Sequence, residues 1–161
     1  MQSIDYLIVG QGVAGTLMAH FLLEAQQSVV VIDNAHPHGA TKAAAGIINP
    51  ITGRRYVKSW RVEELIPFAA STYQQIEQKL GIQIFYPYAI LRALFNEREE
   101  NDWWRRSTEL GYEKYILEQA HLGNYQQHTL PAFGYGELRH AAQVQIGKLA
   151  NAYRNFFWSK I

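Results

Sequence analysis

Three glycines near the start of the chain are spaced for phosphate binding by backbone groups. Gly10, Gly12 and Gly15 complete the pattern G-x-G-x-x-G, with Val13 and Ala14 between the last two. The first glycine permits a sharp turn, the second lets the backbone approach a pyrophosphate, and the third lets a helix pack close to a strand. Unpaired N–H groups at a helix start carry partial positive charge, so they stabilise an anion without a lysine. These five residues form the predicted phosphate-binding turn.

The segments on both sides of the glycines fit a strand–turn–helix–strand unit. Leu7–Val9 is apolar without polar alternation, which predicts a parallel strand covered on both faces. Leu17, Phe21 and Ala25 recur at four-residue spacing, which predicts a helix whose apolar stripe faces the core. Val29–Ile32 then predicts a second buried strand. This context favours a nucleotide site over an ordinary βαβ unit with an accidental glycine pattern, which is the alternative.

A carboxylate follows the second predicted strand. Asp33 at that strand end is placed to accept both hydroxyl hydrogens of an adenosine ribose, with Asn34 beside it. The same carboxylate would repel a 2′-phosphate. The sequence therefore predicts FAD or NAD as ligand in preference to NADP.

Composition excludes several classes of function. The 161 residues suffice for one domain, or for one domain and part of another. A net charge of +1 without a basic cluster argues against a nucleic-acid surface. The absence of cysteine excludes disulfides, thiolate metal sites and a cysteine nucleophile, and it suits a reducing cytoplasm. The start of the chain lacks the features of a signal peptide, and no apolar run approaches the ~20 residues of a membrane span, so we expect a cytoplasmic protein without a membrane partner.

A second stretch of small residues, G-A-T-K-A-A-A-G-I-I, runs from Gly39 to Ile48. Thr41 could donate a hydroxyl hydrogen bond to a phosphate oxygen, and Lys42 could add positive charge nearby. The alanines and Gly46 present almost no side-chain bulk. Such a run either packs a helix tightly or lets a flat ring system lie against the backbone.

The glycine motif, the acid at the second strand end and the Gly39–Ile48 stretch together resemble the amino-terminal half of the D-amino-acid oxidase and glycine oxidase family of flavoproteins. The flavin half of the bifunctional tRNA wobble-uridine methylaminomethyl enzyme belongs to the same broad group. The resemblance implies FAD as cofactor, because a nicotinamide enzyme has no need of the second stretch. It assigns the pyrophosphate to Gly10, Gly12 and Gly15, the ribose to Asp33, the diphosphate to Thr41 and Lys42, and the flavin ring to Ala44, Ala45, Gly46 and Ile47.

The same resemblance implies oxidation of a small-molecule amine, an amino acid or an N-substituted glycine. Hydride passes from the carbon bearing the amine to the flavin, and water hydrolyses the resulting imine. The cofactor supplies this chemistry, so the lack of an obvious acid–base pair is no objection. Two alternatives stay open: a truncated, non-catalytic dinucleotide-binding or interaction module, and a nicotinamide dehydrogenase domain.

Two further pairs of residues are of types that could form sites. Arg54 and Arg55 are adjacent and could hold a substrate carboxylate, although solvated arginines on a hairpin are the more common outcome. His36 and His38 flank Pro37 in a predicted turn. Because they lack further ligands, exposed loop histidines are the preferred interpretation and no metal site is predicted.

The fold class predicted is α/β: a Rossmann-like FAD-binding βαβ unit over residues 1–58, followed by the start of an α+β substrate domain over residues 59–161. Asn96 and Glu99 form a capping-box pattern at the start of one helix of the second part. The remaining pattern predicts a helix over 59–79, strands over 82–95, a helix from Asn96 to Gly111, strands at 115–117 and 137–141, and a helix from Gln143.

The predicted sheet is incomplete in a chain of this length. Two valine-rich strands cannot be covered on both faces by one helix, and members of the resembled family are considerably longer. The chain is therefore interpreted as truncated, or as covering its sheet by homo-oligomerisation or strand exchange.

Overall fold

The computed structural model describes residues 3–36 and 38–158. The chain forms two compact units that interleave along the sequence. The first unit comprises Met1–Gly46, Tyr73–Ile84 and Val144–Ile161, and the second comprises Ile47–Thr72 and Phe85–Gln143. The assignment of 1–58 to cofactor binding and 59–161 to substrate stays a prediction, because the compact units describe packing and not function.

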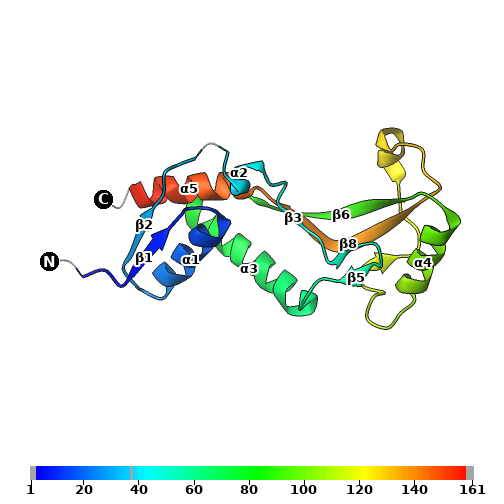
Figure 1. Cartoon of the computed structure of the whole chain (residues 1–161), viewed down its shortest axis with the longest axis horizontal. Helices are drawn as coiled ribbons and strands as arrows, with labels where there is room; N and C mark the ends of the chain where they lie inside the picture. The colour runs from blue at the N-terminus through cyan, green and yellow to red at the C-terminus, as the bar shows by residue number, and fades with distance from the viewer. Residues whose placement is uncertain (1–2, 37, 159–161) are drawn as a thin grey trace. The chain divides into compact units, whose positions relative to one another are not determined.

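The first unit contains the strand–turn–helix–strand arrangement expected from the sequence. Strand β1 (Tyr6–Val9) leads through the glycine turn into helix α1 (Val13–Glu24), and strand β2 (Val29–Ile32) follows. The two strands pair in parallel along their whole length, as Figure 1 shows at the N-terminal end of the chain. The α/β fold class is thereby confirmed.

Helix α5 (Ile146–Trp158) packs against both α1 and the short helix α2 (Ala40–Ala43) in the first unit. Helix α3 (Val62–Leu80) contributes its C-terminal part. The buried core residues here are Ile76, Ile84, Leu149 and Tyr153.

The predicted apolar stripe on α1 was wrong at two of its three positions. Phe21 is 41% exposed and Ala25 is also exposed, whereas Leu17 packs partly buried against the core. The face that α1 buries carries Thr16, Ala19 and His20 instead. A hydrogen bond of 2.5 Å between His20 Nδ1 and the Tyr153 hydroxyl explains why a polar side chain lies on the buried face.

The expectation that β1 and β2 are buried on both faces was also wrong for this chain. Leu7 is 61% exposed, Val9 79% and Ile32 55%. The physical reason is the one foreseen from the length of the chain: one helix covers part of one face of a parallel pair, and the described residues provide no second layer.

The elements of the second unit are β3 (Ile47–Ile48), β4 (Ile51–Thr52), β5 (Val57–Lys58), β6 (Phe85–Leu94), α4 (Glu97–Ser107), β7 (Ile116–Leu117), the 3-10 helix η1 (Gly123–His128) and β8 (Gly134–Val144). The unit is built on a sheet whose strands lie in the order β3–β8–β6, with β7 also paired to β8. Strand β8 pairs with β3 and with β7 in antiparallel orientation. A separate antiparallel pair, β4–β5, forms a hairpin.

Helix α4 starts at the Asn96 cap that the sequence predicted, in a variant of the capping box where Glu99 bonds the residue before the cap and not Asn96 itself. Asn96 Oδ1 accepts a hydrogen bond from the Glu99 N–H at 3.0 Å, and Glu99 Oε2 accepts one from the Phe95 N–H at 3.0 Å. Trp103 on this helix is fully buried, and its indole N–H donates to the Leu117 carbonyl at 2.8 Å. The helix ends at Ser107, earlier than the predicted stop at Gly111.

Two prolines lie inside regular elements, although proline commonly interrupts a strand or kinks a helix. Strand β6 continues through Pro87, which an edge strand tolerates because one side of it needs no backbone donor. Helix α3 continues through Pro67 and starts at Val62, later than the predicted Ser59. The Ser59 hydroxyl instead donates to the Asn49 carbonyl at 2.8 Å.

Across residues 3–36 and 38–158, no helix combines the length and the apolar character that crossing a bilayer requires.

Candidate dinucleotide-binding site

The glycine turn between β1 and α1 is tight, and two of its glycines have geometry that a side chain would not fit. Gly10 has a φ of +96°, which L side chains rarely adopt, and its N–H donates to the Ile32 carbonyl at 2.7 Å. A Cβ on Gly15 would lie 2.0 Å from the Gly10 carbonyl oxygen. The first and third glycines are therefore required by the turn and by the close approach of helix to strand.

Gly12 is the N-cap of α1, and Thr41 lies beside it. The Thr41 Oγ1 accepts a hydrogen bond from the Val13 N–H at 2.9 Å, and a Cβ on Gly12 would lie 3.1 Å from the same oxygen. The Thr16 N–H donates to the Gly12 carbonyl at 2.9 Å, so the amides before Thr16 precede the helical hydrogen-bond ladder. Thr41 keeps its own hydroxyl proton to donate. The structure thus brings the second small-residue stretch to the start of α1.

Asp33 lies directly after β2, and its carboxylate accepts hydrogen bonds from backbone and side-chain donors. Its Oδ2 accepts from the Gln11 N–H at 2.8 Å, and its Oδ1 accepts from the Ala35 N–H at 2.7 Å. The Arg154 guanidinium of α5 forms an ion pair with the same Oδ1. The pKa of Asp33 is lowered below its usual value. The largest cause is the backbone hydrogen bond from Gln11, followed by the backbone hydrogen bond from Ala35 and the positive charge of Arg154.

Arg154 and Gln11 are two site residues that the sequence did not reveal. The Arg154 Nε–H donates to Gln11 Oε1 at 3.1 Å, and Gln11 Nε2 donates to the Ala150 carbonyl at 3.1 Å. Gln11 is buried between these partners. The partners lie 139 and 143 residues from Gln11 along the chain, so no local pattern could have indicated the network.

Lys42 and Asn34 both interact with the loop that follows β2. The Lys42 ammonium donates to the His36 carbonyl at 3.1 Å and to the Ala35 carbonyl at 3.4 Å. Asn34 Oδ1 accepts from the His36 N–H at 3.2 Å. These contacts hold the loop next to Asp33, and the assignment of Lys42 to a diphosphate stays a prediction.

The residues predicted beneath a flavin ring differ in what they contact. Ala44 and Ala45 are exposed. Gly46 has a φ of +68°, and a Cβ there would lie 1.9 Å from the Val144 carbonyl oxygen, so packing within the chain already explains this glycine. Ile47, which belongs to the second unit, is 61% exposed.

Ile47 lines a mainly apolar pocket of about 210 Å³ within the second unit. The residues lining the pocket are Ile47, Tyr88, Ile90, Ala142 and Gln143.

Arg54 and Arg55 of the second unit are exposed in the turn between β4 and β5. The Arg55 carbonyl accepts a hydrogen bond from Arg106 at 2.9 Å.

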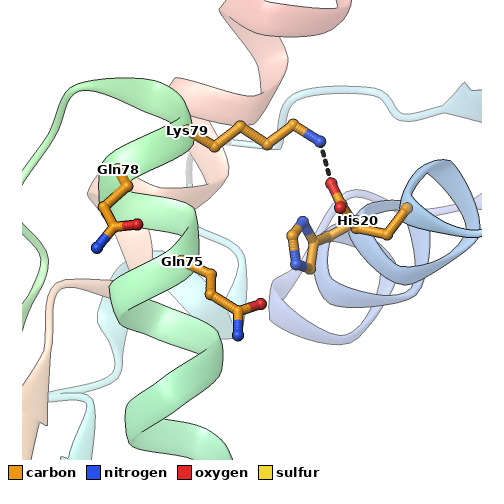
Figure 2. Close-up of a pocket in the computed structure, with 5 residues that line it drawn as sticks. His20, Gln75, Gln78 and Lys79 are labelled. Atoms are coloured by element: carbon orange, nitrogen blue, oxygen red, sulfur yellow. Dashed lines mark hydrogen bonds and ion pairs between the residues drawn. The ribbon is translucent and has the colours of Figure 1, made fainter.

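The first unit contains a separate, polar pocket of about 450 Å³. Figure 2 shows Lys79 extending from α3 toward the helix that carries His20, and an ion pair joins its ammonium to the Glu24 carboxylate. Gln75 and Gln78 complete the lining. None of the residues assigned to a nucleotide lines this pocket.

The residues present at the glycine turn fit a dinucleotide. The slot that a Cβ on Gly12 would fill is bounded by the Thr41 hydroxyl, and backbone amides precede the α1 ladder there. A carboxylate held by backbone donors follows the neighbouring parallel strand. Anion-binding amides on one strand and a ribose acceptor on the next are the chemical groups that such a ligand requires.

Comparison with known proteins identifies the family that this chain matches. Residues 5–157 match the family of FAD dependent oxidoreductases, DAO. The oxidoreductase YurR of Bacillus subtilis is 42% identical over 56 residues, which are 35% of this chain and 15% of that protein. Among solved structures, glycine oxidase from Bacillus cereus aligns with a TM-score of 0.70 at 21% identity, covering 94% of this chain and 44% of its own. The L-amino acid deaminase from Proteus myxofaciens aligns with a TM-score of 0.68 at 17% identity, and the alignment covers 96% of this chain and 36% of the deaminase chain.

The chain therefore spans less than half the length of the solved structures that it matches. Those structures share the fold at low identity, whereas the family match extends over nearly the whole chain. The chain belongs to the DAO family of FAD-dependent oxidoreductases.

Proposed function

We propose that this chain holds the diphosphate and adenosine of FAD in an oxidoreductase that oxidises an amine or an amino acid. The observation that supports this most directly is the turn from Gly10 to Gly15, in which three residues carry no side chain and the Thr41 hydroxyl oxygen lies 2.9 Å from the first amide nitrogen of α1. An anion placed there would be stabilised by backbone dipoles and by a hydroxyl donor.

Each assigned residue has a defined task in this proposal. Gly12 and Ala14 offer backbone N–H groups to the diphosphate. The Val13 N–H donates to Thr41 Oγ1 and so orients that hydroxyl, whose proton is donated to the diphosphate. Asp33 accepts hydroxyl hydrogens of the ribose, and its lowered pKa keeps it ionised at neutral pH. Gly10 and Gly15 shape the turn. Lys42 and Asn34 hold the loop beside Asp33.

The flavin and substrate assignments also belong to the proposal. FAD, when bound, supplies the hydride acceptor. The exposed Ala44, Ala45 and Ile47, with Gly46, leave small and apolar surface for a flat ring. The exposed guanidinium groups of Arg54 and Arg55 are the candidates for binding a substrate carboxylate. The cytoplasmic location and any self-association stay predictions.

FAD retention by Gly12→Val tests the cofactor assignment. The valine side chain would enter the space beside Thr41 Oγ1 and block the approach of a phosphate to the backbone. We expect the parent chain to be yellow after gel filtration with FAD, and the variant to be colourless with an unchanged circular dichroism spectrum. Ala89→Val, at an exposed position of β6, introduces the same side chain as a control and should retain FAD. Equal retention by Gly12→Val would contradict the placement.

Anaerobic mixing of the FAD-loaded chain with glycine, N-methylglycine and larger amino acids tests the reaction. Loss of flavin absorbance with one of these substrates is the expected result. A yellow chain whose spectrum no amine changes would retain the cofactor assignment and refute amine oxidation by this chain.

A further inference from the structure

The Asp33 carboxylate has few acceptor sites left in the structure. A carboxylate offers about four lone-pair directions on its two oxygens. Oδ1 accepts from the Ala35 N–H and from Arg154, and Oδ2 accepts from the Gln11 N–H. Oδ1 is therefore saturated, and Oδ2 retains one lone pair for a ligand.

Arg154 is held at this position by more than the ion pair. Its Nε–H donates to Gln11 Oε1, and the Gln11 amide is anchored in turn by the Ala150 carbonyl, one helical turn before Arg154 on α5. The side chains of Arg154 and Asp33 are 27% and 21% exposed, so solvent screens their attraction only in part. Of the two groups of donors on Asp33, the backbone amides are fixed by the fold, and only the Arg154 side chain can move away.

We propose that Arg154 and the ribose of an adenosine nucleotide compete for Asp33 Oδ1, so that Arg154 sets how strongly the site selects a 2′-hydroxyl. The inference rests on the proposed function, because it requires an adenosine nucleotide at Asp33. In the structure the Arg154 guanidinium contacts Oδ1, the acceptor that a second ribose hydrogen bond needs. Arg154 is thus a positioning residue that acts through Asp33.

The competition predicts a change in selectivity and not merely in affinity. Removal of Arg154 frees Oδ1 for the ribose, but it also removes a positive charge that would attract any phosphate. The ratio of the dissociation constants for 2′-deoxy-ADP and ADP cancels the effect on phosphate, because the two probes differ only in the 2′-hydroxyl. We expect this ratio to be about two- to fivefold larger in Arg154→Met than in the parent chain, since a partly exposed ion pair contributes little more.

The experiment is isothermal titration calorimetry of the full chain with each probe. Arg105→Met is the matched control: Arg105 lies on α4 and pairs with Asp102 at 3.6 Å, in the second unit, and its removal should leave the ratio unchanged. Asp33→Asn should bring the ratio close to one. An equal ratio in Arg154→Met and the parent would overturn the inference while leaving nucleotide binding intact. If neither chain binds ADP, the proposed function fails and the inference fails with it.

A second measurement avoids substitution, in case Arg154→Met does not fold. The arginine Nε–Hε resonance of Arg154 can be followed by nuclear magnetic resonance in the parent chain during titration with ADP. Displacement of the guanidinium from Asp33 and Gln11 should shift this resonance, whereas 2′-deoxy-ADP should shift it less. A resonance unmoved at saturating ADP would overturn the competition.

Discussion

At Gly15 the close approach of two backbone segments leaves no space for a side chain. A Cβ there would lie 2.0 Å from the Gly10 carbonyl oxygen and 3.3 Å from Cγ2 of Ile8. The nearest atom belongs to the backbone of the same turn, so it cannot rotate away as a flexible side chain would. The residue type at this position is thus fixed by packing before any ligand is considered.

Gly15→Ala should therefore destabilise the chain, by about 1–3 kcal/mol or more, because overpacking forces the backbone to shift. Gly39→Ala is the control: its Cβ would meet only the His36 carbonyl oxygen at 3.7 Å, and its φ of −63° suits alanine. Urea unfolding followed by circular dichroism compares the two. Equal stability of Gly15→Ala and the parent would show that the turn is looser than the structure indicates.

At the residue scale the sequence predicted what depends on local spacing. Gly10, Gly12 and Gly15 and the acid after β2 follow from short patterns, and the structure places these residues at adjacent strand ends. Arg154 could not be predicted, because it meets Asp33 across 121 residues. The assigned functions of these residues await the binding experiments.

At the scale of elements, a buried polar contact links α1 to α5. His20 is 2% exposed and Tyr153 is fully buried, and they are hydrogen-bonded at 2.5 Å. Burial raises the pKa of the Tyr153 hydroxyl and lowers that of the His20 imidazole, so both groups are neutral near pH 7. Two neutral partners satisfy each other without the cost of a buried charge.

Tyr153→Phe should destabilise the chain by about 1–3 kcal/mol, because it leaves His20 Nδ1 buried without a partner. Tyr125→Phe removes the same hydroxyl from a side chain that is 63% exposed, and it should change stability little. Thermal or urea unfolding measures both. A Tyr153→Phe chain as stable as Tyr125→Phe would show that His20 finds another partner.

The lowered pKa of His20 predicts a pH dependence of stability. Below the ordinary histidine value of 6.5 the unfolded chain binds a proton at this residue that the folded chain does not. The contribution of His20 is therefore complete above pH 6.5 and decreases as the pH falls toward the folded pKa. Urea midpoints from pH 8 to pH 5 should show this decrease in the parent and in His121→Gln, where the replaced side chain is 82% exposed, but less of it in His20→Gln.

Elements with local signals were predicted well, and buried faces less so. The capping box at Asn96 lies within four residues, and the sequence located it. The buried face of α1 depends on α5, which comes more than 120 residues later, and apolar spacing alone selected Phe21 and Ala25 in error.

At the scale of the whole molecule, apolar strand surface is exposed in the first unit. Leu7, Val9, Val30 and Ile32 are all more than a third exposed on β1 and β2. The solved structures that align with this chain are more than twice its length. Exposed apolar strands of this kind favour pairing with further protein surface.

The isolated chain should therefore self-associate, and Val9→Thr with Ile32→Thr should reduce the association. Both threonines keep β-branching, so the strands should persist while apolar area is lost. Leu110→Thr with Leu130→Thr is the control, since these leucines are 96% and 82% exposed in the second unit but lie outside its strands. Sedimentation velocity over a range of concentrations measures the effect. A chain that stays monomeric at all concentrations would contradict the prediction.

The interleaving of the two units has a consequence for biosynthesis. The chain leaves the first unit after residue 46, contributes Tyr73–Ile84 to it, and completes it only from residue 144 onward. Gln11, His20 and Asp33 are therefore synthesised 121 to 143 residues before their partners on α5 emerge from the ribosome. During that interval the N-terminal strands and α1 cannot complete their packing, so this region is the part of the nascent polypeptide that chaperones would need to shield.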